Sequence, residues 1–283
     1  MNDTPIVWMN GELMPADEVR ISPFDLGLMV GVGLFETLPA YDGKVFALDQ
    51  HHERMESCIT LVASHDTKLF PVEEMRAAMH AVIRANDLSE GFSRVRVSLS
   101  GGVNPLIGGE ATGDLIITAV RQSEPEPLAI LDISGFPCNE FSNLVGVKSA
   151  SYADHLSSWW VGLSSGADEV IRLNTLGDLC ECAMANLFLV RDEVVMTPHL
   201  ESGCLEGVTR AIVLDLCDGL ELDSVACQLD ENDLYAADEL FITSSIREVQ
   251  SAEMLGSERD KPMPITQMIR KAYREHIQHT LGI

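Results

Sequence analysis

The chain holds 283 residues, of which 46% are hydrophobic and 22% are charged, and its formal net charge is −25 at pH 7. This length supplies one large domain or two domains of ordinary size, and the composition is too apolar for extended disorder. A negative charge of this size makes nucleic acids and anionic membranes poor partners.

Seven cysteines are scattered along the chain, and Cys180 and Cys182 are the only close pair. Two thiols without further Cys or His neighbours do not make a zinc site, so we expect no metal. The N-terminus lacks a basic region and an apolar signal core, and no apolar run has membrane-spanning length. We therefore expect a cytoplasmic protein whose thiols are reduced.

The first 122 residues predict a smaller α/β domain. Asn10-Gly11 is a strong hairpin signal, and a helix that starts after Pro71 shows apolar residues at helical spacing. The glycine-rich loop 101–113 lacks the Gly-Lys-Ser/Thr pattern of a phosphate loop. Strands are predicted at 6–9, 34–40, 44–48, 94–99 and 115–120, and helices at 49–63 and 72–85.

A polar, proline-bearing run around residues 123–130 predicts an interdomain linker, and residues 131–283 a larger C-terminal domain. Three predicted strands between 169 and 190 follow one another too closely for helical crossovers, which indicates a largely antiparallel sheet or barrel. Strands are predicted at 128–133, 169–173, 178–181, 187–190, 221–227 and 240–243, and helices at 153–164, 209–217, 232–236 and 265–279.

Lys148 stands out among the five lysines of the chain, because Val145, Gly146 and Val147 precede it while the other four lie in polar surroundings. A lysine that is shielded from water loses part of its ammonium stabilisation, and its free amine can then form a Schiff base. The alternative is a lysine that extends from a strand end into solvent.

Several motifs in fixed order surround Lys148, and together they resemble the class IV aminotransferase family over about residues 10–249. This family comprises the pyridoxal 5'-phosphate enzymes of fold type IV: branched-chain and D-amino-acid transaminases and aminodeoxychorismate lyases. The motifs are GVGLFET at 31–37, HHER at 51–54, GVKSASYA at 146–153, LCECAMANLFLV at 179–190, GVTR at 207–210 and DELFITSS at 238–245.

The resemblance implies a two-domain α/β (α+β) protein with mainly antiparallel or mixed sheets and a barrel-like larger domain that carries the cofactor lysine, Lys148. It also implies a homodimer. Pyridoxal 5'-phosphate would form a Schiff base with Lys148, which would then act as general acid and base.

Glu181 stands between two cysteines on an otherwise apolar predicted strand, where a carboxylate needs a cationic or donor partner. The resemblance makes that partner the protonated pyridine nitrogen of the cofactor. The alternative is a glutamate at a strand edge that faces water.

A phosphate cup is also implied by the resemblance. The planar guanidinium group of Arg54 can donate two parallel hydrogen bonds to phosphate oxygens. A helix that begins at GVTR has free backbone N–H groups and a dipole that favours an anion at its N-terminus. The residues implied for the cup are Arg54, Val208, Thr209, Ser244 and Ser245.

Tyr152 either hydrogen-bonds the cofactor's phenolic oxygen or packs in the core. We interpret Asn186 as a residue that holds backbone near the site. The histidines His51, His52 and His155 lack metal-ligand spacing and are interpreted as surface residues.

Val30 and Val32 occupy positions where many family members have Tyr and Asp. The change at Val30 removes a polar group that could hydrogen-bond a substrate carboxylate.

Three functions are consistent with the pattern: a transaminase acting on an amino acid and a 2-oxo acid, an aminodeoxychorismate lyase releasing 4-aminobenzoate and pyruvate, and a non-catalytic protein on the same fold. The intact Lys148 and Glu181 favour the two enzymes, and the transaminase is our first choice.

Overall fold

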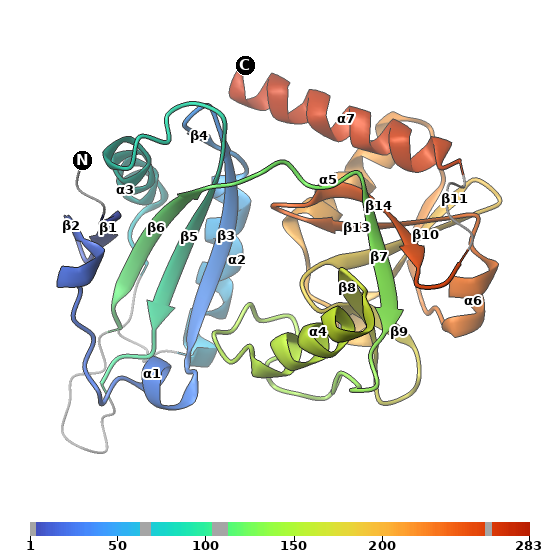
Figure 1. Ribbon diagram of the computed structural model, residues 1–283, viewed down its shortest axis with the longest axis horizontal. Coiled ribbons are helices and arrows are strands. Elements are labelled where there is room, and N and C mark those ends of the chain that lie inside the picture. The colour runs from blue at the N-terminus through green and yellow to red at the C-terminus, as the bar shows by residue number, and fades with distance from the viewer. Residues whose placement is uncertain (1–3, 63–68, 104–112, 258–261) are drawn as a thin grey trace. The chain divides into compact units, whose positions relative to one another are not determined.

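A computed structural model describes residues 4–62, 69–103, 113–257 and 262–283 (Figure 1). Contacts divide the chain into unit 1, residues 1–124 and 147–152, and unit 2, residues 125–146 and 153–283. The middle of the predicted loop 101–113, residues 104–112, lies outside the described residues. Within the described part of the chain, the helices lack the combined length and apolarity that crossing a membrane requires.

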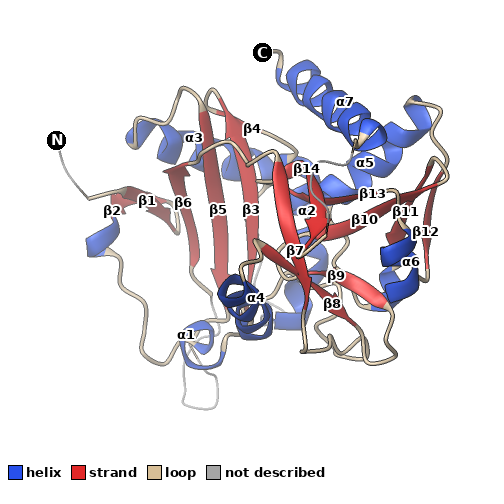
Figure 2. Ribbon diagram, turned by 45° about the vertical axis from the view of Figure 1, so that its right-hand side comes forward, coloured by secondary structure: helices blue, strands red, loops and turns tan. Residues whose placement is uncertain are grey.

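Unit 1 is built on a six-stranded antiparallel sheet in the order β2-β1-β6-β5-β3-β4 (Figure 2). The predicted Asn10-Gly11 hairpin is confirmed, because both residues adopt positive φ between β1 and β2. The elements are β1 (Ile6–Met9), β2 (Glu12–Pro15), α1 (Leu26–Val30), β3 (Gly33–Tyr41), β4 (Lys44–Val45), α2 (Leu48–Val62), α3 (Val72–Ala85), β5 (Phe92–Ser100) and β6 (Leu115–Arg121).

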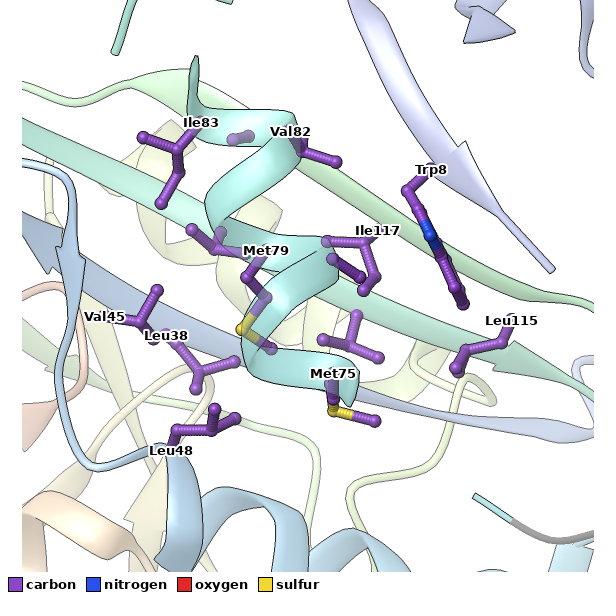
Figure 3. Close-up of a cluster of buried hydrophobic side chains, with 14 of the residues drawn as sticks. Trp8, Leu38, Val45, Leu48, Met75, Met79, Val82, Ile83, Leu115 and Ile117 are labelled. Carbon is purple, nitrogen blue, oxygen red and sulfur yellow. The ribbon is translucent and has the colours of Figure 1, made fainter. Parts of the chain in front are cut away.

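The core of unit 1 lies between one face of this sheet and the helices α2 and α3. Figure 3 shows Met75, Met79 and Ile83 of α3 among the strand residues Leu38 and Ile117. Because side chains alternate along a strand, Glu36 shares the helix-covered face with Leu38, whereas Phe35 lies on the opposite face.

Unit 2 is built on an eight-stranded mixed sheet in the order β12-β11-β10-β13-β14-β7-β8-β9. The edge strand β9 also contacts β10 and β11, so the sheet curls into a half-barrel. The elements are β7 (Leu128–Ile133), α4 (Ala153–Ser165), β8 (Glu169–Leu173), β9 (Leu179–Cys182), β10 (Asn186–Arg191), β11 (Val194–Pro198), α5 (Val208–Gly219), β12 (Ser224–Cys227), α6 (Glu231–Ala236), β13 (Glu239–Ser244), β14 (Glu248–Met254) and α7 (Pro264–Leu281).

The predicted antiparallel character holds for most strand pairs of unit 2, whereas β11–β12, β14–β7 and β7–β8 pair in parallel. The strand β14 was not predicted, because buried Glu248, Gln250 and Glu253 interrupt its apolar pattern. The predicted strand 44–48 ends at Val45, because Ala47 adopts positive φ and α2 begins directly afterwards.

The predicted domain division into residues 1–122, a linker at 123–130 and residues 131–283 stays a prediction. Contacts group residues 147–152 with the N-terminal unit, whereas the prediction placed them in the larger C-terminal domain. The physical reason is backbone pairing with β3: the Phe35 amide donates to the Lys148 carbonyl at 3.0 Å, and the Ala150 amide donates to the Gly33 carbonyl at 2.9 Å.

Candidate active site

Lys148 lies beside Phe35 and Tyr152 in unit 1. Its Nζ is 4.7 Å from the centroid of the Phe35 ring and 6.0 Å from that of Tyr152. The two rings meet edge to face at 5.3 Å. Lys148 is therefore partly enclosed by aromatic carbon rather than extended into open solvent.

Arg96 covers the same aromatic ring, with its guanidinium carbon 3.9 Å from the Phe35 centroid. It is opposite Thr37 in the β3–β5 register, so it shares the face of the sheet that carries Phe35. Burial lowers the pKa of Arg96. Sequence reasoning missed this residue; the alternation of Arg94 and Arg96 with apolar neighbours was the signal that could have identified it.

Arg54 forms a buried cluster with Glu36 and His51 on the helix-covered face of the sheet. Its Nε and Nη2 donate to the two Glu36 carboxylate oxygens at 2.8 and 2.6 Å, and His51 Nδ1 is 2.7 Å from Oε2. The interpretation of His51 as a surface residue is wrong, because the side chain is 2% exposed. The hydrogen bond to Glu36 explains how a histidine is accommodated there.

The charges in this cluster are strongly coupled. Burial opposes the ionisation of Glu36, but the hydrogen bond from His51 and the charge of Arg54 outweigh it and lower the pKa of Glu36 to about 2. Burial lowers the pKa of His51, and Arg54 and Lys148 act in the same direction. The cluster therefore combines a carboxylate, a guanidinium and a neutral imidazole at neutral pH.

Glu181 is the central acidic residue of unit 2, and it is buried on β9 as the sequence indicated. Its Oε2 accepts a hydrogen bond from the Leu205 amide at 3.0 Å, and His155 Nε2 lies 3.6 Å from its Oε1. The alternative of a water-facing glutamate is wrong. The surface interpretation of His155 missed this neighbour, because nothing in the sequence brings α4 to β9.

Arg172 adds a positive charge near Glu181, because the two residues are directly opposite in the β8–β9 pair. Its side chain is buried, and neither its Nε nor its Nη1 has a hydrogen-bond partner within the described part of the chain.

The loop before α5 is held by Asn186. Asn186 Nδ2 donates to the Leu205 carbonyl at 2.8 Å, and Glu181 binds the amide of the same residue. The Asn186 amide oxygen also fills the position of any Cβ on residue 207, so a residue larger than glycine requires a shift there. The interpretation of Asn186 as a residue that holds backbone near the site agrees with these contacts.

The first turn of α5 contains Val208 and Thr209, both buried. The N-cap, Gly207, provides no side chain to bond the first amides of the helix. Strand β10 is paired with β13, with Asn186 opposite Thr243, so the end of β13 is near the start of α5. Ser244 is the last residue of β13, and its Oγ accepts from the Arg247 amide at 3.2 Å.

The predicted site residues thus fall into two groups. Unit 1 brings Arg54 to Glu36 and His51 on the helix-covered face of its sheet. Around Phe35, on the opposite face, it brings Lys148 to Tyr152 and Arg96. Unit 2 brings Glu181 to the loop before α5 and holds Val208, Thr209, Ser244 and Ser245 around the start of α5 and the end of β13.

Comparisons with known proteins show which family has this sequence pattern. Residues 33–253 match the family model described as amino-transferase class IV. An aminodeoxychorismate lyase of Bacillus subtilis is 29% identical over 86% of this chain and 84% of its own length. A branched-chain-amino-acid aminotransferase of Salmonella typhimurium is 28% identical over 94% of this chain and 91% of its own.

Solved structures give the same assignment. A branched-chain aminotransferase of Thermoproteus uzoniensis with norvaline aligns with a TM-score of 0.88 and 28% identity, covering 99% of this chain and 95% of that one. A second branched-chain amino acid aminotransferase, complexed with N-(5'-phosphopyridoxyl)-L-glutamate, aligns with a TM-score of 0.86 and 25% identity, covering 98% and 95%. The fold type expected from the sequence is confirmed, and the chain belongs to the class IV aminotransferase family.

Proposed function

We propose that the chain is a pyridoxal-phosphate-dependent aminotransferase, which moves an amino group between an amino acid and a 2-oxo acid. The observation that carries this proposal is Lys148, held by backbone hydrogen bonds at β3 beside Phe35 and Tyr152, in a chain of this family. Solved relatives with pyridoxamine 5'-phosphate and a phosphopyridoxyl amino acid support the cofactor.

The residues present fit this cofactor. The amides at the start of α5 have no side-chain cap, as the binding of an anion there requires. Glu181 is a buried carboxylate that suits a protonated ring nitrogen. We propose that Arg54, Val208, Thr209, Ser244 and Ser245 hold the phosphate, and that Tyr152 borders the ring.

When bound, pyridoxal phosphate supplies an electrophilic carbonyl carbon and a ring that accepts electrons. Lys148 would hold the group covalently through Nζ and, once displaced by the substrate amine, use Nζ to move a proton from the substrate's α-carbon. Glu181 would keep the proton on the ring nitrogen, and the hydrogen bond from the Leu205 amide would keep the Glu181 carboxylate oriented. Phe35 shields Lys148 Nζ from water.

Absorption spectroscopy with borohydride reduction tests the cofactor. Purified protein supplied with pyridoxal phosphate should develop a visible band, and borohydride should fix the label on the peptide that contains Lys148. Lys148→Ala should take up no reducible label, whereas Lys271→Ala, at an exposed lysine of α7, should behave as the unaltered protein. A protein that stays colourless would refute the enzyme proposal.

The second candidate is an aminodeoxychorismate lyase, which the similarity to the Bacillus subtilis enzyme supports. An aminotransferase keeps the amino group after its first half-reaction, so an amino acid alone should remove the visible band and a 2-oxo acid should restore it. A lyase needs no acceptor. Release of pyruvate from aminodeoxychorismate, with no amino acid of either chirality removing the band, would establish the lyase instead.

Val30 and Val32 lead us to propose an apolar amino donor, because neither offers a hydrogen bond to a polar side chain. Branched-chain amino acids should therefore remove the visible band faster than aspartate does. Equal rates for both donors would contradict this part of the proposal.

We also propose that the protein is a cytoplasmic homodimer. The large exposed hydrophobic side chains of α1, Leu28, Met29 and Val30, are consistent with association. All seven cysteines are described and free, which suits a reducing compartment. Light scattering coupled to size-exclusion chromatography should give twice the mass of one chain, and a monomer at all concentrations would rule out the dimer.

A further inference from the structure

Tyr273 of the C-terminal helix α7 reaches the first turn of α5, where Thr209 lies. The two hydroxyl oxygens are 3.4 Å apart, at the long end of the hydrogen-bond range, and both side chains are almost fully buried. The two helices pack against each other within unit 2. Thr209 belongs to the proposed phosphate site, whereas the Tyr273 hydroxyl has no role in the chemistry described above.

The direction of this hydrogen bond decides what Thr209 can bind. Either hydroxyl can be the donor in this pair, and because burial raises the pKa of the Tyr273 phenol well above its usual value, the phenol keeps its proton and can donate. A threonine hydroxyl has one proton and two acceptor lone pairs. When Tyr273 donates to Thr209 Oγ1, the Thr209 proton is available for another acceptor.

An anion is the acceptor that the position of the Thr209 hydroxyl favours most. The first amides of α5 lie in the same turn as Thr209 and have no side-chain cap, and the helix dipole adds positive potential there. A carboxylate or phosphate oxygen would therefore meet amide and hydroxyl protons together.

We propose that Tyr273 is a positioning residue for Thr209, and that it directs the Thr209 hydroxyl proton toward a phosphate monoester bound at the start of α5. This inference rests on the proposed function, because that phosphate would belong to pyridoxal phosphate. Tyr273 itself would not touch the ligand.

The test compares two ligands that differ only in the phosphate. Dissociation constants of pyridoxal phosphate and of pyridoxal are measured by absorbance for the unaltered protein, Tyr273→Phe, Thr209→Val and the double variant. Tyr273→Phe keeps the buried ring and removes only the hydroxyl. The matched control is Tyr235→Phe, at a tyrosine that is 67% exposed.

Tyr273→Phe and Thr209→Val should each weaken pyridoxal phosphate binding by roughly 3- to 10-fold, the effect of one hydrogen bond. The double variant should bind no more weakly than Thr209→Val, because both changes remove the same interaction. Pyridoxal binding should stay unchanged in all variants. Inorganic phosphate, used as a competitor of pyridoxal phosphate, should lose affinity by a similar factor in Tyr273→Phe.

Three results would overturn the proposal: unchanged binding of pyridoxal phosphate by Tyr273→Phe, an equal loss for pyridoxal and pyridoxal phosphate, or independent losses that multiply in the double variant. Thr209→Ser distinguishes the hydroxyl from the fold, because it keeps the hydroxyl and should retain tight binding. An unaltered protein that binds no pyridoxal phosphate would refute the proposed function itself. Tight binding that ignores Tyr273 would refute only this inference.

Discussion

The amide oxygen of Asn186 occupies the space where a Cβ atom on residue 207 would lie, so the side chain of one residue fixes the identity of the other. Gly207 has ordinary extended backbone angles, which any residue can adopt. The requirement for glycine at this helix start is therefore one of space rather than of conformation.

Gly207→Ala should force Asn186 or the start of α5 to move. We expect it to lower the free energy of unfolding by roughly 1–3 kcal/mol, as overpacking of a buried site does, and to weaken pyridoxal phosphate binding. Thermal unfolding and absorbance titration measure the two effects. The double variant Gly207→Ala/Asn186→Ala makes room for the methyl group, and no partial recovery of stability in it would contradict the steric explanation.

Glu36 makes the protein sensitive to acid. Its pKa in the folded protein, about 2, is below the ordinary value of 4.5, so its stabilisation is complete above about pH 4.5 and is lost as the pH falls toward 2. The loss is on the order of 3 kcal/mol. The pKa of His51 is also lowered in the folded state, so its protonation on unfolding below about pH 6.5 acts in the same direction.

Glu36→Gln should therefore be less stable than the unaltered protein at pH 7, and its stability should fall less between pH 5 and pH 3. Chemical denaturation at a series of pH values measures this slope. Glu73→Gln removes an exposed carboxylate that pairs with Arg76 and should leave the slope unchanged. Parallel pH profiles for Glu36→Gln and the unaltered protein would show that the buried cluster is not the acid-sensitive element.

Glu169 should behave in the opposite way. Burial raises its pKa to about 7, and Arg247, 3.7 Å away, offsets only part of that effect. Because the folded pKa is above the unfolded one, the protein loses stability as the pH rises through about 4.5 to 7. Glu169→Gln should raise the thermal midpoint at pH 8.5, by an amount that corresponds to roughly 1–3 kcal/mol, with little change at pH 4.

Glu239 provides the contrast for that experiment. It is also a buried glutamate of unit 2, but its carboxylate accepts from the amides of Ile265 and Thr266 and from the Thr266 hydroxyl at the start of α7. Glu239→Gln should lower the thermal midpoint at pH 8.5. Glu169 Oε2 has no hydrogen-bond partner among the described residues. If both variants shift the midpoint in the same direction, this missing hydrogen bond is not what separates them.

Glu181→Gln should keep the cofactor and slow amino transfer by roughly 100-fold or more, the size expected when one group that acts in the transition state is lost. Stopped-flow absorbance with an amino donor measures the proton-transfer step, and the visible spectrum reports cofactor retention. Unchanged turnover would remove Glu181 from the mechanism. His155→Gln keeps a donor toward Glu181 Oε1 and should lose far less activity than His155→Leu.

The sequence by itself determined the family, most element bounds and the identity of the candidate residues, because hydrophobic period and turn chemistry are local and the motifs lie in fixed order. The helix α3, for example, has the predicted bounds 72–85. Strand β14 escaped prediction because buried Glu248 is neutralised by Arg274, a partner 26 residues away.

Only the tertiary structure decided which side chains meet. Glu36 and Arg54 are 18 residues apart and His51 looked like a surface residue, yet strand alternation and the packing of α2 bring the three together in a buried cluster. Lys148 is grouped with the N-terminal unit because its backbone pairs with β3, a contact more than 100 residues apart along the chain that no local pattern encodes. Pairing between distant segments depends on the whole core. That is why the sequence named Arg54 and Lys148 without placing them, and did not single out Glu36.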